Sequence, residues 1–129
     1  MSKKLYGSST EKAIKNFPVS GWAMPEDFLR ALAIIKMYAA EVNGGLRQIP
    51  KGHAIKIARA AKQIASGKHM DQFPLDVFQT GSGTSTNMNM NEVIATLAKV
   101  HPNDHVNFGQ SSNDVIPTAL NISCALKVC

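Results

Sequence analysis

The sequence is poor in the features that mark secreted, membrane-spanning and repeat proteins. Its two cysteines, Cys124 and Cys129, lie too close together to frame a disulfide scaffold, so we expect free thiols in the reducing cytoplasm. No apolar run approaches the length of a membrane span, and the opening residues lack the apolar core of a secretory signal. Internal repeats and low-complexity tracts are also missing. What remains is one ordinary domain of 129 residues, 44% of them hydrophobic, which is enough to bury a core.

Positive charge is concentrated in the first half of the chain. Residues 1–70 carry 12 Lys and Arg against 4 Asp and Glu, whereas residues 71–129 carry 2 against 5. The basic side chains are scattered along an amphipathic segment, as on the solvated face of a helix, so we expect neither a nucleic-acid nor a membrane partner. An anion site in the second half therefore needs backbone N–H groups, helix N-termini and neutral donors, or cations from elsewhere.

The spacing of apolar residues predicts an all-α fold with irregular polar connections. A short helical signal covers residues 10–17. A longer helix is expected from Pro25 to a stop at Asn43-Gly44-Gly45, and a third from Pro50 to Ser66-Gly67. Packing is sufficient to explain their apolar faces, which we assign to Phe28, Leu32, Ile35, Ala39 and Val42 and to Ile55, Ala58, Ala61 (or Ala60), Ile64 and Ala65.

A glycine-containing turn, Gly81-Ser82-Gly83-Thr84, opens a polar stretch that runs to Asn91. The two glycines allow the backbone to approach a ligand, and the helix that we expect from Thr84 offers unpaired N–H groups at its start. Ser82 and Thr84 add hydroxyl groups. An ordinary turn with Thr84 as the helix N-cap explains the same residues, and both interpretations stay open at this point. A Walker loop is excluded, because no Gly-Lys-Ser/Thr follows.

Three asparagines, at positions 87, 89 and 91, occupy the first turns of this predicted helix. Asparagine is a poor former of helix interiors. Three of them in one segment therefore indicate that function or hydrogen bonding between elements overrides local preference.

A second polar cluster, His101-Pro102-Asn103-Asp104, follows that helix. Pro102 disfavours helical backbone at His101, so we expect a polar turn that ends the helix. His101 and His105 are four residues apart, as in some zinc sites. The proline disrupts the helical geometry that such a pair needs and no thiolate lies nearby, so we expect no metal site.

A third cluster, Gln110-Ser111-Ser112-Asn113-Asp114, begins the next helical signal. Ser111 and Asp114 resemble a capping box, and Pro117 indicates either a helix that begins one turn earlier or a kink. Clusters of neutral hydroxyl and amide donors thus recur three times within forty residues, each at a helix start or in a tight turn. Such donors suit a small dicarboxylate, because they hold its carboxylates and stabilise charge that develops on one of them.

Three segments of the chain resemble the N-terminal signature blocks of class II fumarases, members of the fumarase/aspartase superfamily: FQTGSGTSTNMNMNEVIA, VHPNDHVN and GQSSNDVIPTA. The resemblance covers nearly the whole chain. It implies a helical N-terminal lyase domain over residues 1–110 and the start of a long bundle helix over residues 111–129. It also implies metal-free and cofactor-free hydration of fumarate to L-malate in the tricarboxylic acid cycle, by a homotetramer whose active sites each draw on three subunits.

The resemblance also implies roles for individual residues. In the family pattern a second dicarboxylate site near the entrance is formed by a turn that corresponds to His101, Pro102, Asn103 and Asp104. Many fumarases have an arginine three residues before this histidine, where the present chain has Ala98, so the cation of that site differs here. The residues that match the substrate-binding positions are Ser82, Gly83, Thr84, Ser111, Ser112 and Asn113.

Family members are several hundred residues long, and the segments with their catalytic histidine, serine and lysine are not in this sequence. We therefore expect an N-terminal fragment that holds no catalytic residue and is inactive by itself. Two alternatives stay open. One is a fragment of an aspartase-type ammonia-lyase, although aspartases tend to have Gly-Ala-Gly-Thr where this chain has Ser82. The other is a non-catalytic helical module whose basic half binds an acidic partner or nucleic acid.

Overall fold

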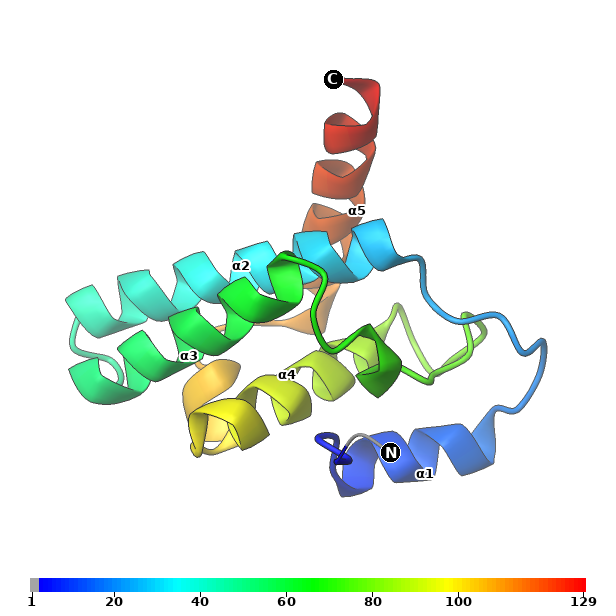
Figure 1. Ribbon diagram of the computed structural model, residues 1–129, viewed down its shortest axis with the longest axis horizontal. Coiled ribbons are helices and arrows are strands. Elements are labelled where there is room, and N and C mark those ends of the chain that lie inside the picture. The colour runs from blue at the N-terminus through cyan, green and yellow to red at the C-terminus, as the bar shows by residue number, and fades with distance from the viewer. Residues whose placement is uncertain (1–2) are drawn as a thin grey trace.

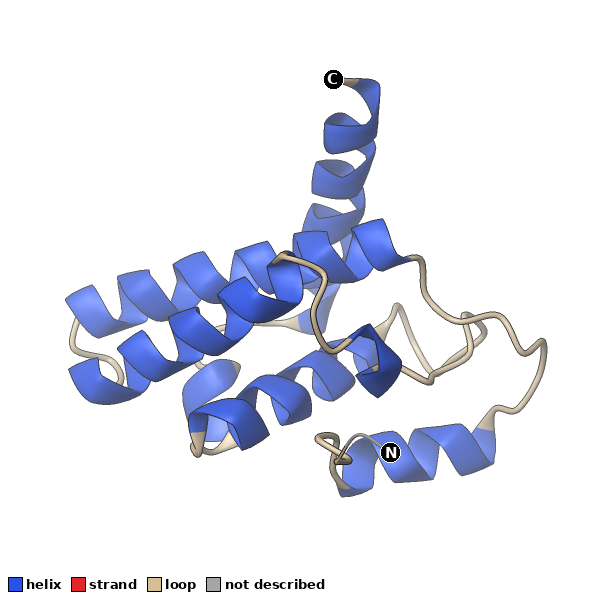
Figure 2. Cartoon of the chain, in the orientation of Figure 1, coloured by secondary structure: helices blue, strands red, loops and turns tan. Residues whose placement is uncertain are grey.

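The computed structural model describes residues 3–129, and within that range it consists of helices joined by irregular segments (Figures 1 and 2). The one extended pairing among the described residues is an isolated bridge between Ala23 and Asp76. The predicted all-α fold is confirmed. No helix in the same range is long and apolar enough to cross a membrane. The elements are α1 (Ser8–Asn16), α2 (Glu26–Gly45), α3 (Lys51–Ala65), η1 (Met70–Gln72), α4 (Thr84–Ala98), η2 (Pro102–Val106) and α5 (Ser112–Val128).

The longest helix, α2, pairs with α3 as an antiparallel hairpin (Figure 1). It begins directly after Pro25 and ends at Gly45, the last residue of the predicted stop. Gly44 lies inside the helix, where an added Cβ would stand only 2.5 Å from the Cβ of Ala54 in α3. Gly44 therefore permits close helix packing, and the left-handed backbone that follows the helix falls on Arg47 (φ 58°).

Replacing Gly44 with alanine is expected to destabilise the chain by about 2 kcal/mol, because the new methyl group forces the hairpin apart. Gly45→Ala is the matched control, since nothing lies within 4 Å of its added Cβ. We expect Gly45→Ala to raise the free energy of unfolding by about 0.5 kcal/mol, because alanine lowers the conformational entropy of the unfolded chain. Urea unfolding followed by circular dichroism measures both variants, and equal stabilities would contradict the packing role of Gly44.

The core lies where α3 contacts both α2 and α4. Most of the predicted apolar face of α3 is confirmed, because Ala60, Ala61 and Ile64 are buried and Ala58 and Ala65 pack against the core. Its first residue was wrong, since Ile55 is 53% exposed and Ile57 is fully buried. On α2, Val42 is 58% exposed. Both helices carry overlapping apolar series, and their neighbours determine which series is covered. The buried residues of α3 are Ala54, Ile57, Ala60, Ala61 and Ile64.

Helix α4 lies at the centre and contacts α1, α2, α3, α5 and η2. Its three asparagines are buried. The side-chain amide of Asn89 donates to the carbonyl of Gln72 at 3.0 Å, and that of Asn87 donates to Asn107 Oδ1 at 3.2 Å. Hydrogen bonds to other segments therefore account for Asn87 and Asn89, as one of the sequence-based explanations predicts. Asn91 differs, because its amide contacts Met88 Sδ within α4 at 3.8 Å.

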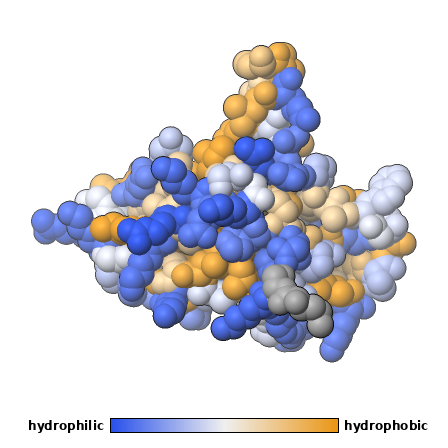
Figure 3. All heavy atoms as spheres, in the orientation of Figure 1, coloured by the Kyte–Doolittle hydropathy of each residue, from blue (hydrophilic) through white to orange (hydrophobic). Residues whose placement is uncertain are grey.

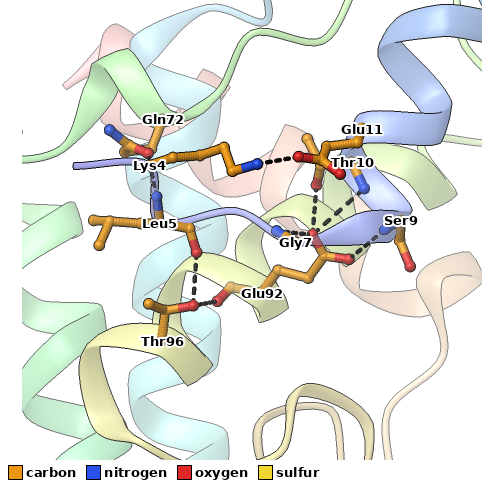
Figure 4. Close-up of polar contacts among 9 residues, drawn as sticks. All are labelled: Lys4, Leu5, Gly7, Ser9, Thr10, Glu11, Gln72, Glu92 and Thr96. Atoms are coloured by element: carbon orange, nitrogen blue, oxygen red, sulfur yellow. Dashed lines mark hydrogen bonds and ion pairs between the residues drawn. The ribbon is translucent and has the colours of Figure 1, made fainter. Parts of the chain in front are cut away.

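A buried carboxylate, Glu92, attaches the N-terminal segment to α4 (Figure 4). It accepts hydrogen bonds from the N–H groups of Gly7, Ser9 and Thr10 and from the Thr10 hydroxyl. These donors belong to the first turn of α1, where N–H groups have no partner within the helix. The helix N-terminus also carries partial positive charge, so Glu92 both caps and electrostatically stabilises α1.

Candidate functional site

The loop before α4 is attached to the segment before α2 through Asp76. Its carboxylate accepts hydrogen bonds from the N–H groups of Ser20 (2.6 Å), Gly21 (2.8 Å) and Phe78 (2.9 Å) and from the Ser20 hydroxyl (2.9 Å). Burial by itself raises the pKa of the Asp76 carboxyl, but these donors outweigh it and lower the pKa to about 2. The loop therefore keeps this anchor throughout the physiological pH range.

Asp76→Asn is expected to loosen this loop and to remove a pH dependence at acidic pH. Because the folded-state pKa of Asp76 lies below the ordinary value, its stabilising effect is present above about pH 4 and is lost as the pH falls through about 2. Thermal melts of wild type and variant between pH 2 and pH 6 measure the difference. A difference that stays constant over this range would contradict the role of the carboxylate.

The glycines of the Gly81-Ser82-Gly83-Thr84 turn are required by the backbone. Gly81 and Gly83 have φ values of +63° and +83°, in the left-handed region that favours glycine. A Cβ on Gly83 would also lie 2.9 Å from Ile116 Cγ2, so the turn packs directly on the first turns of α5. This contact places the start of α4 beside the start of α5.

Thr84 is not the N-cap of α4. The cap position is Gly83, and the side chain of Gln79 reaches across the turn to accept from both the N–H and the hydroxyl of Thr86, each at 2.8 Å. The Thr84 hydroxyl instead lies 3.2 Å from the Ser112 hydroxyl, although the two residues are 28 positions apart. The N-cap interpretation of Thr84 is therefore wrong, and its hydroxyl faces the third polar cluster.

The start of α5 supplies the other half of this site. Ser111 caps the helix, since its hydroxyl accepts from the N–H of Asn113 at 3.2 Å. The reciprocal half of the predicted capping box is replaced by a contact of Asp114 with the Thr118 hydroxyl. α5 begins at Ser112, little more than one turn before Pro117, which is the first of the two alternatives. The substrate-binding candidates Ser82, Gly83, Thr84, Ser111, Ser112 and Asn113 thus gather at two adjacent helix N-termini, with exposed or half-exposed side chains.

The candidate second site lies at the other end of α4, about 20 Å away along the 15 residues of this helix. His101 Nδ1 accepts from the N–H groups of Asn103 (3.2 Å) and Asp104 (3.1 Å), and Pro102 opens the turn η2. The predicted polar turn is confirmed. Because Nδ1 is an acceptor, the neutral ring carries its proton on Nε2.

Position 98 offers no cation to this second cluster, because it is occupied by a buried alanine. The next residue, Lys99, is exposed and has left-handed backbone (φ 57°). Lys99 and Pro102 line the same shallow groove between α4 and the N-terminal segment. Lys99 is thus the basic side chain that borders the turn.

Two buried ionic groups were missed by the sequence reasoning. Glu92 lies inside the block that resembles fumarases, and Lys36 lies on α2 four residues after the buried Leu32. Glu92 and Lys36 can each be identified in the sequence as a charged residue at a position where the helical spacing predicts an apolar one. Lys36 bonds to the segment that precedes Ser111, so it belongs to the surroundings of the site.

The fold and the site together define a class: an all-α chain with neutral hydroxyl and amide donors at two adjoining helix N-termini. The family model described as lyase matches residues 1–129, and the chain belongs to this lyase family.

Similarity to individual proteins is more specific. The chain is 55% identical to the class II fumarate hydratase of Xylella fastidiosa (strain Temecula1) over 96% of its own length and 28% of the relative. It is 54% identical to class II fumarate hydratase 2 of Pseudomonas aeruginosa, with the same coverage of 96% and 28%. The crystal structure of class II fumarase from Schistosoma mansoni superposes with a TM-score of 0.95 at 41% identity, over 98% of this chain and 29% of that one. The resemblance to the N-terminal part of class II fumarases is confirmed, and the chain spans a little over a quarter of these relatives.

Proposed function

We propose that this chain supplies one wall of the substrate site of a fumarate hydratase, which interconverts fumarate and L-malate. One observation carries the proposal: the Thr84 and Ser112 hydroxyls meet at 3.2 Å where α4 and α5 begin. The 55% identity to a class II fumarate hydratase supports this substrate class. None of the contacts described above favours the aspartase alternative, which we keep as an outcome of the assay below.

The proposed chemistry needs an environment that stabilises negative charge without a side-chain cation in this chain. Removal of a proton next to a carboxylate of L-malate leaves a carbanion whose electron pair delocalises into that carboxylate. Hydroxide then leaves the adjacent carbon and the double bond of fumarate forms. Hydroxyl donors from Ser82, Thr84 and Ser112, together with two helix N-termini, hold and stabilise the charged carboxylate. The base that takes the proton belongs to segments outside this chain.

The turn at His101, Pro102, Asn103 and Asp104 is proposed as a second, peripheral dicarboxylate site. Its support is the exposed imidazole, which has Nε2–H available as a donor, and the neighbouring ammonium of Lys99 in place of the usual arginine. Since Lys99 is an exposed point charge rather than a bidentate donor, we expect weaker binding there than at an arginine-containing turn.

A homotetramer in the cytoplasm, acting in the tricarboxylic acid cycle, is the proposed state of the whole enzyme. Figures 1 and 3 support the association of several chains, because α5 projects from the body with apolar residues along its length. Leu126 and Val128 are 63% and 88% exposed. A groove of about 600 Å³ between α5, the start of α2 and the Gly81–Gly83 loop is mostly apolar. We propose that residues 111–129 begin the central bundle and that residues 1–110 form the N-terminal domain.

A chimera tests the function. The chain replaces the corresponding N-terminal segment of the Xylella fastidiosa relative, and loss of fumarate absorbance measures hydration. We expect an active chimera, and we expect the 129-residue chain alone to form no malate. Thr84→Val is expected to lower kcat/KM about 100-fold, the usual effect of removing one donor to developing charge. Ser66→Ala, which removes a hydroxyl bonded to the Gln63 carbonyl at the C-terminal end of α3, is the control and leaves activity unchanged. Full activity of Thr84→Val would overturn the proposal, and deamination of L-aspartate would favour the aspartase alternative.

A further inference from the structure

The most deeply buried ionisable side chain in the described part of the molecule is a lysine. Lys36 lies in the middle of α2 and has no exposed surface. Its Nζ donates to Asn107 Oδ1 at 3.0 Å and to Gln110 Oε1 at 2.9 Å. Both acceptors are neutral amides, and among residues 3–129 no ion pair includes Lys36. Burial alone lowers the pKa of Lys36 to about 7. The fold thus bears the cost of a buried charge without a counter-charge.

Asn107 and Gln110 belong to the turn at residues 107–110, which follows η2 and leads into the site. Asn107 Oδ1 also accepts from Asn87 in α4, and Asn107 Nδ2 donates to the carbonyl of Gln110 at 3.1 Å. Gln110 Nε2 in turn donates to the carbonyls of Val106 (2.9 Å) and Phe108 (3.2 Å). The turn is therefore closed by its own amides. It is joined to α2 by the Lys36 ammonium and by the side-chain amide of Asn43, which donates to the Phe108 carbonyl at 3.1 Å. Gln110 directly precedes Ser111, so the position of this turn sets the position of the Ser111–Asn113 donors.

We propose that Lys36 is a positioning residue for the dicarboxylate site, holding Asn107 and Gln110 so that Ser111–Asn113 face Thr84. The inference rests on the proposed function for its catalytic consequence. An isolated buried ammonium costs stability, and an apolar residue of similar length would fill the same space without that cost. The lysine at this position is therefore explained by the ordering of Asn107 and Gln110 and not by a contribution to the free energy of folding. A structural role alone predicts that its removal weakens the fold, whereas a positioning role predicts weaker function in a more stable fold.

Lys36→Met separates these roles. In the active chimera we expect kcat/KM for L-malate to fall about 100-fold, as for misplacement of a binding group by about 1 Å. We expect the melting temperature of the 129-residue chain to rise by about 5 °C. Lys56→Met, on the exposed face of α3, is the matched control and changes neither quantity. An unchanged kcat/KM, or a lower melting temperature in Lys36→Met, would overturn the proposal.

A measurement on the 129-residue chain alone makes the inference independent of activity. In amide NMR spectra, Lys36→Met is expected to shift the signals of Ser111, Ser112 and Asn113 and to leave those of Ser8 and Ser9 in α1 unchanged. Unmoved signals at residues 111–113 would overturn the positioning role even if the chimera is inactive. An inactive wild-type chimera with shifted signals would instead contradict the proposed function and leave the positioning role supported.

Discussion

Replacing Glu92 with glutamine is expected to lower the free energy of unfolding by about 3 kcal/mol, since hydrogen bonds to a charged acceptor contribute more than neutral ones. The carboxylate is 7% exposed and accepts from three N–H groups and one hydroxyl of the N-terminal segment. In the variant, an amide NH₂ group faces some of these donors. The first turn of α1 then keeps unpaired N–H groups and loses a compensating negative charge.

Urea unfolding measures the loss of stability in Glu92→Gln, and hydrogen exchange locates it. We expect exchange to accelerate most in α1, because the carboxylate is the main polar link between that helix and α4 (Figure 4). Glu41→Gln, on the exposed side of α2, is the control and is expected to change stability by less than about 0.5 kcal/mol. A loss of similar size in both variants would show that the capping of α1 does not depend on Glu92.

The stability of the wild-type chain is expected to rise by about 4 kcal/mol between pH 7 and pH 10.5 through Lys36 alone. The folded-state pKa of about 7 lies below the unfolded value of 10.5, so within this window the unfolded chain binds a proton that the folded chain does not. Below pH 7 the lysine is charged in both states and the full cost is present. Since the side chain has no exposed surface, solvent does not screen this cost.

Lys36→Met removes this part of the pH dependence. At pH 7 we expect the variant to be more stable by about 2 kcal/mol, because the lost desolvation cost exceeds the cost of an unpaired Gln110 Oε1. Denaturant unfolding of wild type and variant at several pH values gives the difference directly, since all other titrating groups are shared. We expect this difference to shrink and change sign as the pH approaches 10.5. A difference that does not vary with pH would contradict burial of the charged lysine.

Much of the helical layout follows from short-range signals. Pro25 and Pro50 precede helices at the predicted positions, and Ser111 caps the last one. Each signal depends on backbone conformation or on a hydrogen bond to a residue two positions away. The polar turn at Pro102 was also predictable, because the proline restricts the residue before it. Such effects need no knowledge of the rest of the chain.

The apolar faces were predictable in large part. On α3 the predicted Ile64 and Ala61 (or Ala60) are buried, but Ile57 rather than Ile55 is covered where α3 meets α2 and α4. Gly44 also shows that a contact between two helices could not be predicted from the sequence. It belongs to a predicted stop but lies inside α2, and the contact with Ala54 that requires a glycine arises only when the two helices meet.

The sequence by itself determined which residues are candidates for the site: hydroxyls and amides next to glycine turns and helix starts. The tertiary structure decided that Thr84 meets Ser112 instead of capping its own helix, because Gln79 takes the capping role. It also decided that Glu92 and Lys36 are buried, with partners as far as 85 and 74 residues away. A helix start is defined by its near neighbours, whereas the partner of a buried charge depends on how distant segments pack.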